Sequence, residues 1–195
     1  LKHCSRANAQ ALSAQEPGGV AQRFLDRTQP SLEAQLCNLA DEIAYNAHDI
    51  DDGVRSGLIT LQQLEDVPLF DEHRRATLAQ YSRLGEASQG RRLLYETIRR
   101  MLSEQVYDVI SASRTALQAS APVSADAARL LAPLIGFSPA MQEKSQALKT
   151  FLLRNLYRHP QVMHTTGQAQ QVVNDLFAAY MNAPHTLPQR PVPLQ

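Results

Sequence analysis

Three carboxylates, an imidazole and a phenol recur at helical spacing between residues 36 and 57 of the chain. They are Asp41, Tyr45, His48, Asp49 and Asp52. At about 100° per residue, these side chains fall in a band about 100° wide on one face of a single helix. Carboxylates and imidazole bind divalent metals, and a tyrosine ring can lie against a sugar or a base. The spacing therefore predicts a helix with a polar face that could hold a metal or a ligand.

The opposite side of the same helix is apolar. A stripe about 80° wide by the same count is formed by Leu32, Leu39, Ile43, Ala47, Ile50 and Val54. The polar side carries no Lys, and Arg55 lies near its edge, so its acids lack the i,i+4 partners of an ordinary exposed stripe. Neighbouring carboxylates repel unless a cation or a substrate compensates them. Two interpretations stay open from the residues alone: a solvated surface, or a binding site.

Apolar residues at helical spacing, separated by helix-capping and helix-breaking residues, occur throughout the rest of the chain. No segment alternates between apolar and polar residues with a period of two, so the pattern predicts an all-α protein. Residues 1–6 read as the end of a helix, and 16–19 as a loop. The dipeptide Pro30-Ser31 is expected to open the central helix, with the proline in its first turn, and Gly57 is expected to end it. Further helices are predicted over residues 61–66, 70–84, 90–119, 125–131, 140–158 and 162–181.

Composition limits the classes of partner. The 19 basic and 19 acidic residues give a formal net charge of zero, so overall charge indicates neither nucleic acid nor membrane. No apolar run approaches the roughly 18 residues of a spanning helix, which favours a protein without a membrane segment. Cys4 and Cys37 are too few and too far apart for a disulfide framework. Reduced thiols in a cytoplasmic protein are the expectation.

The motif LADEIAYNAHDIDD, residues 39–52, resembles the bacterial deoxynucleoside triphosphate triphosphohydrolases, the dGTPase-like members of the HD-domain phosphohydrolases. Segments GFSPAMQ at 136–142 and FLLRNLYRHPQV at 151–162 also look like C-terminal parts of that family. The resemblance implies an HD-domain-like helical bundle fragment over residues 1–60. It implies a C-terminal helical subdomain over 61–183, followed by a Pro-rich extended tail over 184–195.

The resemblance also implies a metal site of which this chain holds one part. Proteins of the family bind their metal, Mg²⁺ or Mn²⁺ by expectation, with a His, an adjacent His-Asp pair and a later Asp. By position in the motif, Asp41 is the later Asp, and the chain resembles the C-terminal half of the enzyme. His48-Asp49 could itself be read as the pair, but it follows the separate Asp instead of preceding it, so we reject that interpretation.

The same resemblance implies the reaction and its partners. A deoxynucleoside triphosphate and water would give deoxynucleoside and triphosphate, with Tyr45 facing the deoxyribose and Asp49 its 3′-hydroxyl. The family commonly forms symmetric assemblies, so a homo-oligomer is expected. Since the other metal ligands belong to a region N-terminal to this one, the 195-residue chain alone is expected to be inactive.

Two other functions remain open. One is an HD-type phosphohydrolase that acts on another nucleotide, and the other is a helical interaction module without catalysis. Three pairs of adjacent arginines could lie in a contact with a partner: Arg74-Arg75, Arg91-Arg92 and Arg99-Arg100. They could contact an effector nucleotide, single-stranded DNA or a neighbouring subunit, or they could be ordinary solvated helix charge.

Overall fold

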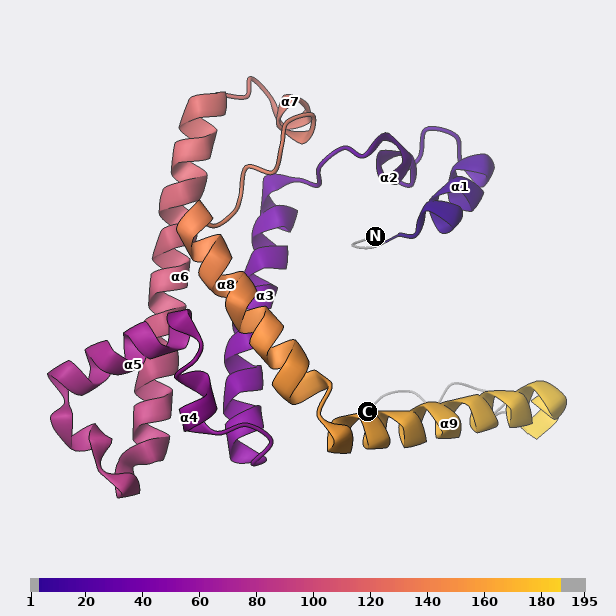
Figure 1. Cartoon of the computed structure of the whole chain (residues 1–195). Helices are drawn as coiled ribbons and strands as arrows, with labels where there is room; N and C mark the ends of the chain where they lie inside the picture. Colours follow the sequence, from indigo (N-terminus) through magenta and orange to yellow (C-terminus); the bar gives the residue numbers. More distant parts are fainter. Residues whose placement is uncertain (1–3, 187–195) are drawn as a thin grey trace, which may run out of the picture.

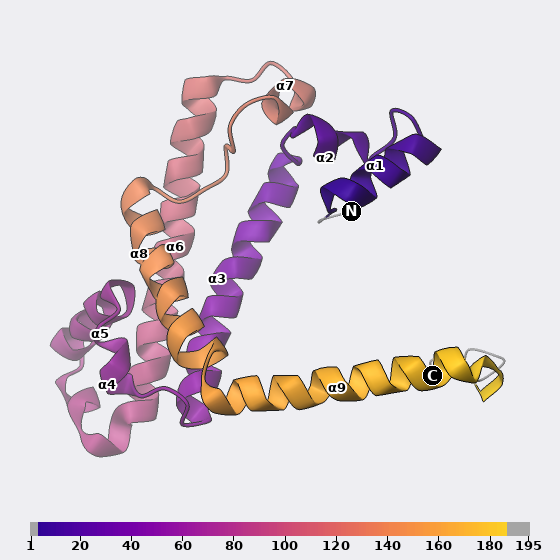
Figure 2. The same ribbon diagram turned by 45° about the vertical axis from the view of Figure 1, so that its right-hand side comes forward.

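A computed structural model describes residues 4–186 of the chain, and within this range it contains helices and loops without a strand. The predicted all-α class is therefore confirmed. Three long helices form the centre: α3 (Leu32–Arg55), α6 (Gly90–Ser120) and α8 (Pro139–Leu152). In Figures 1 and 2, α8 runs obliquely across α3 and α6, and α3 contacts both α6 and α8.

Shorter elements complete this bundle. The helix α5 (Pro68–Gln80) packs against α6 and α8, and α4 (Leu61–Leu64) connects it to α3. Two short 3₁₀ turns, η1 (Ser82–Gly85) and η2 (Ala87–Gln89), lead from α5 into α6. The short helix α7 (Ala125–Arg129) follows α6.

Most sequence signals for helix starts act as expected, although Pro30 lies before α3 and not in its first turn. Ser31 accepts a hydrogen bond from the N–H of Ala34 at the start of α3, and Ser138 accepts one from Met141 at the start of α8. Thr60 and Gln63 cap α4 reciprocally, each side chain bonding the other residue's backbone N–H. Gly57 follows α3 with φ of +74°, a conformation that glycine adopts without steric cost. Side-chain capping bonds and the glycine at position 57 therefore determine these helix boundaries.

The N-terminal prediction is wrong where the structure describes it. The hydroxyl of Ser5 accepts a hydrogen bond from the N–H of Asn8, so a helix begins at Arg6 instead of ending there. This helix, α1 (Arg6–Gln15), stops before the predicted loop, and α2 (Gln22–Asp26) follows it. Serine is a preferred N-cap residue, so this hydrogen bond marks the start of a helix.

The predicted helix over 140–158 changes form near its end. After Leu152 the backbone continues as a π-helical turn, η3 (Leu153–Tyr157), before α9 (Pro160–Asn182) begins. In Figures 1 and 2, α9 extends away from the bundle, and none of its residues is buried. Of the predicted tail, Pro184–Thr186 form a 3₁₀ turn, and the residues after 186 lie outside the described range. Within the described range, no helix combines the length and the apolar character needed to cross a membrane.

One hydrophobic core joins the central helices. Its fully buried members come from α3, α4, α5, α6 and α8 and include Ile50, Leu64, Leu69, Phe70, Met101, Leu148 and Leu152. Ile50 lies before residue 60 and the others after it, so the core crosses the predicted boundary between residues 60 and 61. The division into two regions stays a prediction.

Gly53 allows a close approach within this core. A Cβ atom at Gly53 would lie 2.8 Å from two side-chain carbons of Ile59 and 3.3 Å from a methyl of Leu156. Alanine gains about 1 kcal/mol of helix propensity over glycine, but overpacking a core costs about 1–3 kcal/mol. We expect Gly53→Ala to lower the free energy of unfolding in urea by about 1 kcal/mol, the balance of these effects.

Gly167→Ala is the matched control, because Gly167 also lies within a helix and a Cβ there would meet no atom within 4 Å. That variant should unfold at the wild-type urea concentration or higher. A Gly53→Ala protein as stable as wild type would contradict the packing described at this position.

Candidate functional site

The buried face of α3 is broader than the predicted apolar stripe and is displaced around the helix. Ile43, Ala47 and Ile50 are buried as expected. Gln35, Asn46 and Gly53 are buried as well, whereas Leu36 is 48% exposed. The reason is tertiary, since α3 contacts both α6 and α8 on adjacent sides. The helix therefore presents its opposite side, which carries Asp41 and Tyr45, to the surface.

The three predicted site residues lie one turn apart on this side. Asp41 and Tyr45 are exposed, with Tyr45 at 66%, and Asp49 is half-buried. At 1.5 Å per residue, the eight positions from Asp41 to Asp49 correspond to about 12 Å along the helix axis. One rigid helix thus holds two carboxylates and a phenol at fixed spacing, which is the property that a metal or ligand site requires.

Asp49 has a partner that the sequence did not suggest. The hydroxyl of Tyr157 in η3 donates a hydrogen bond to Asp49 Oδ2. The contact joins residues 108 positions apart and ties the end of α8 to α3. Partial burial of the phenol, together with this hydrogen bond, raises the pKa of Tyr157 to about 12. No local pattern in the sequence pairs Tyr157 with Asp49, so this functional candidate was missed.

The raised pKa of Tyr157 makes a prediction about pH. A phenol whose pKa is higher in the folded state than in the unfolded state stabilises the fold below the unfolded value of about 10. That contribution is lost as pH rises from about 10 through the folded pKa of about 12. In an ultraviolet titration of the six tyrosines, we expect one to ionise near pH 12. Asp49→Asn should lower that pKa part of the way toward its usual value, and Tyr157→Phe should remove the high-pH step. A titration that Asp49→Asn leaves unchanged would contradict this contact.

The neighbouring acids on α3 are paired. Glu42 Oε1 lies 2.8 Å from Lys149 Nζ on α8, and Asp52 Oδ1 lies 2.7 Å from Arg55 Nη2. Glu42 follows Asp41 directly in sequence, so Lys149 offsets a negative charge beside the proposed ligand. The ion pair also holds α8 at a fixed position relative to this part of α3.

The residues around Asp41 fit a hard divalent cation in chemistry but offer it few ligands. Carboxylate oxygens are the donors that Mg²⁺ and Mn²⁺ prefer. Between residues 4 and 186, however, no group of three or more His, Cys, Asp or Glu side chains lies close enough to hold a metal. Within this range the structure thus contains no complete set of such side chains around Asp41.

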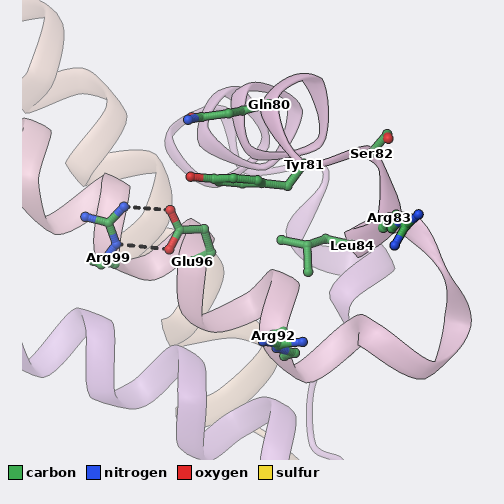
Figure 3. A pocket seen from close by; sticks show the side chains of 8 residues that line it. All are labelled: Gln80, Tyr81, Ser82, Arg83, Leu84, Arg92, Glu96 and Arg99. Atoms are coloured by element: carbon green, nitrogen blue, oxygen red, sulfur yellow. Dashed lines mark hydrogen bonds and ion pairs between the residues drawn. The ribbon is translucent and has the colours of Figure 1, made fainter.

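Two pockets of the described chain are lined by none of these three side chains. One, of about 810 Å³, is at the start of α3 and is lined in part by Phe24, Asn38 and Phe137. Gln35 fixes its wall, since its Oε1 accepts hydrogen bonds from the N–H groups of Leu134 (3.0 Å) and Ile135 (3.2 Å). A second pocket, of about 610 Å³, lies between η1 and the start of α6 (Figure 3).

Comparison with known proteins identifies the relatives of this chain. Residues 135–192 match the family model described as a phosphohydrolase-associated domain. A deoxyguanosinetriphosphate triphosphohydrolase-like protein of Ralstonia nicotianae is 50% identical over 188 residues. This chain is a homologue of the dGTPase-like proteins. The resemblance found in its motifs is thereby confirmed.

Other homologues agree with this result. Proteins with the same name from Bordetella pertussis and Thiobacillus denitrificans are 49% and 46% identical over 188 residues. Each alignment covers 96% of this chain but only 46–48% of the relative. The chain thus spans about half the length of the curated relatives it matches.

Proposed function

We propose that this chain is part of a metal-dependent deoxynucleoside triphosphate triphosphohydrolase. The observation that carries the proposal is identity of 50% to a triphosphohydrolase-like protein over nearly the whole chain. The matched length includes α3, whose exposed side carries Asp41, Tyr45 and Asp49. The phosphohydrolase-associated family model, which covers α8, η3 and α9, supports the same class of enzyme.

Asp41 has the chemistry of a metal ligand in this proposal. When bound, a divalent cation lowers the pKa of coordinated water and polarises a phosphoryl oxygen. The Asp41 carboxylate would supply one negatively charged oxygen to that ion, from a helix anchored by the core. Lys149 keeps the adjacent Glu42 compensated, so the second acid does not add an unpaired negative charge beside the substrate phosphates.

Tyr45 and Asp49 would bind the sugar. The exposed ring of Tyr45 can lie against the deoxyribose, where a 2′-hydroxyl would clash or lose its water. The carboxylate of Asp49 can accept a hydrogen bond from the 3′-hydroxyl through Oδ1, while Tyr157 occupies Oδ2. A site built to bond a hydroxyl rejects ligands that lack it, because its own polar group then stays unpaired. Tyr157 acts here as a positioning residue for Asp49.

The test uses a chimera in which residues 1–195 replace the matching segment of the Ralstonia nicotianae relative. With dGTP and Mg²⁺ or Mn²⁺, we expect this protein to release inorganic triphosphate and deoxyguanosine, resolved by anion-exchange chromatography. The 195-residue chain alone should bind metal weakly and release neither product. Clear turnover by the chain alone would contradict the assignment of Asp41 as one ligand among several.

The products also separate this proposal from its alternatives. Orthophosphate or pyrophosphate in place of triphosphate would favour an HD-type phosphohydrolase with another nucleotide substrate. A chimera with native helical content that hydrolyses no nucleotide would favour an interaction module, and the triphosphohydrolase proposal would fail.

A further inference from the structure

A second pocket with a positively charged wall lies at the far end of α5, away from the polar side of α3. It has a volume of about 610 Å³ and is formed by the end of α5, by η1 and by the first turns of α6. Figure 3 shows Arg83, Arg92 and Arg99 around it, together with the ring of Tyr81. Glu96 is the acidic residue among its lining side chains.

Two of the three arginines have no partner within residues 4–186. Arg83 and Arg92 are exposed, and neither makes an ion pair or a side-chain hydrogen bond with the described residues. Arg99 differs, since Glu96 binds it through two hydrogen bonds of 2.6 and 3.0 Å. The pocket thus offers two uncompensated guanidinium groups, the side chains best suited to bind phosphate oxygens in pairs.

The position of Arg92 at the start of a helix is electrostatically unfavourable. Arg91 and Arg92 lie in the first turn of α6, which contains no acidic residue and whose N-cap, Gln89, makes no side-chain capping bond. Positive charge is disfavoured at a helix N-terminus, because the macrodipole is positive there. An anion between Arg92 and Arg83 would offset this repulsion.

The pocket also contains an exposed aromatic ring. Tyr81 is 46% exposed, and the guanidinium of Arg100 lies 5.9 Å from its ring centroid on one side. Arg100 is held in place by Gln80 and by Glu96. The ring is therefore supported from behind, and its accessible surface can stack on a flat group.

We propose that this pocket is a binding site for a phosphate-bearing small molecule, held by Arg83 and Arg92 and separate from the α3 site. The shared chemistry is a chain of phosphate groups, which could come from free triphosphate or from a nucleotide whose base lies on Tyr81. The inference rests on the pocket and its charges, and it stands whether or not the proposed hydrolase activity is correct.

The first experiment measures binding of inorganic triphosphate to the 195-residue chain by isothermal titration calorimetry. We expect the double variant Arg83→Gln/Arg92→Gln to weaken binding by at least about tenfold, since each charge-assisted contact carries about that factor. Arg114→Gln is the matched control, because Arg114 is an exposed arginine of the same helix outside this pocket. It should bind as the wild type does. Equal affinity of the double variant and the wild type, or no binding by the wild type, would overturn the proposal.

Glu96 provides a test in the opposite direction. Its hydrogen bond to Arg99 holds the pKa of the Glu96 carboxyl at about 2, so the group is ionised at neutral pH and neutralises Arg99. Glu96→Gln would leave Arg99 uncompensated, and triphosphate should bind at least about threefold more tightly, less so at high salt. Unchanged or weaker binding would overturn the assignment.

The source of the phosphate is decided by comparing ligands. If dGTP binds more tightly than triphosphate and Tyr81→Ala removes the difference, the site takes a nucleotide. If both bind equally and Tyr81→Ala changes neither, it takes the free polyphosphate. Each result supports the phosphate site, provided that the arginine double variant weakens the binding in question by at least about tenfold.

Discussion

Asp41→Asn should lower the dGTP turnover of the chimera by about 10²–10³-fold, because a metal ligand supports several kcal/mol of transition-state stabilisation. The substitution keeps the size of the side chain and removes its negative charge. Asp41 is exposed on α3 and outside the hydrophobic core, so the fold should be retained. The measurement is the initial rate of triphosphate release with saturating Mn²⁺, together with the circular dichroism of the variant.

Asp52→Asn is the control for this result. Asp52 is an exposed aspartate on the same helix, but its carboxylate is bound by Arg55, and it has no role in the proposed site. Its turnover should stay within about twofold of wild type, since exposed ion pairs contribute little. Equal losses in both variants would show that a general loss of negative charge, and not ligation by Asp41, lowers the rate.

Phe70→Ala should give the largest loss of stability, about 3–5 kcal/mol in the free energy of unfolding. Phe70 is fully buried in α5 and belongs to the core that joins α3, α6 and α8. Its removal leaves a cavity that these helices cannot fill without moving relative to one another. Urea denaturation followed by circular dichroism measures the effect.

Tyr107→Ala serves as the stability control. This aromatic side chain on α6 is 72% exposed, and the substitution should change the unfolding free energy by no more than about 0.5 kcal/mol. If Phe70→Ala were as mild as Tyr107→Ala, the side chain of Phe70 could not occupy the closed core described above.

Much of the fold could be predicted from the sequence, because local signals fix it. Thr60, Ser124 and Ser138 all cap helices where the sequence places them. The helix N-terminus needs a side-chain acceptor for its free N–H groups, and few residue types supply one. The interpretation of residues 1–6 as a helix end overlooked the hydroxyl of Ser5, which caps the start of α1.

The candidate site was predictable in part. Helical periodicity placed Asp41 and Tyr45 together on one side of α3, and both are exposed. It did not predict the burial of Gln35 or the partner of Asp49, because both depend on segments about 100 positions away. Such contacts are set by how η3 and the loop before α8 pack against α3, which no local pattern records. The roles of the three residues stay predictions until the site is tested.

The most direct measurement is a crystal structure of the chimera with Mn²⁺, in which the metal is located by its anomalous scattering. The account predicts a bound ion with a carboxylate oxygen of Asp41 as a direct ligand, and Tyr45 and Asp49 along the same side of α3. An ion held entirely by other residues, with Asp41 directed away from it, would contradict the central claim.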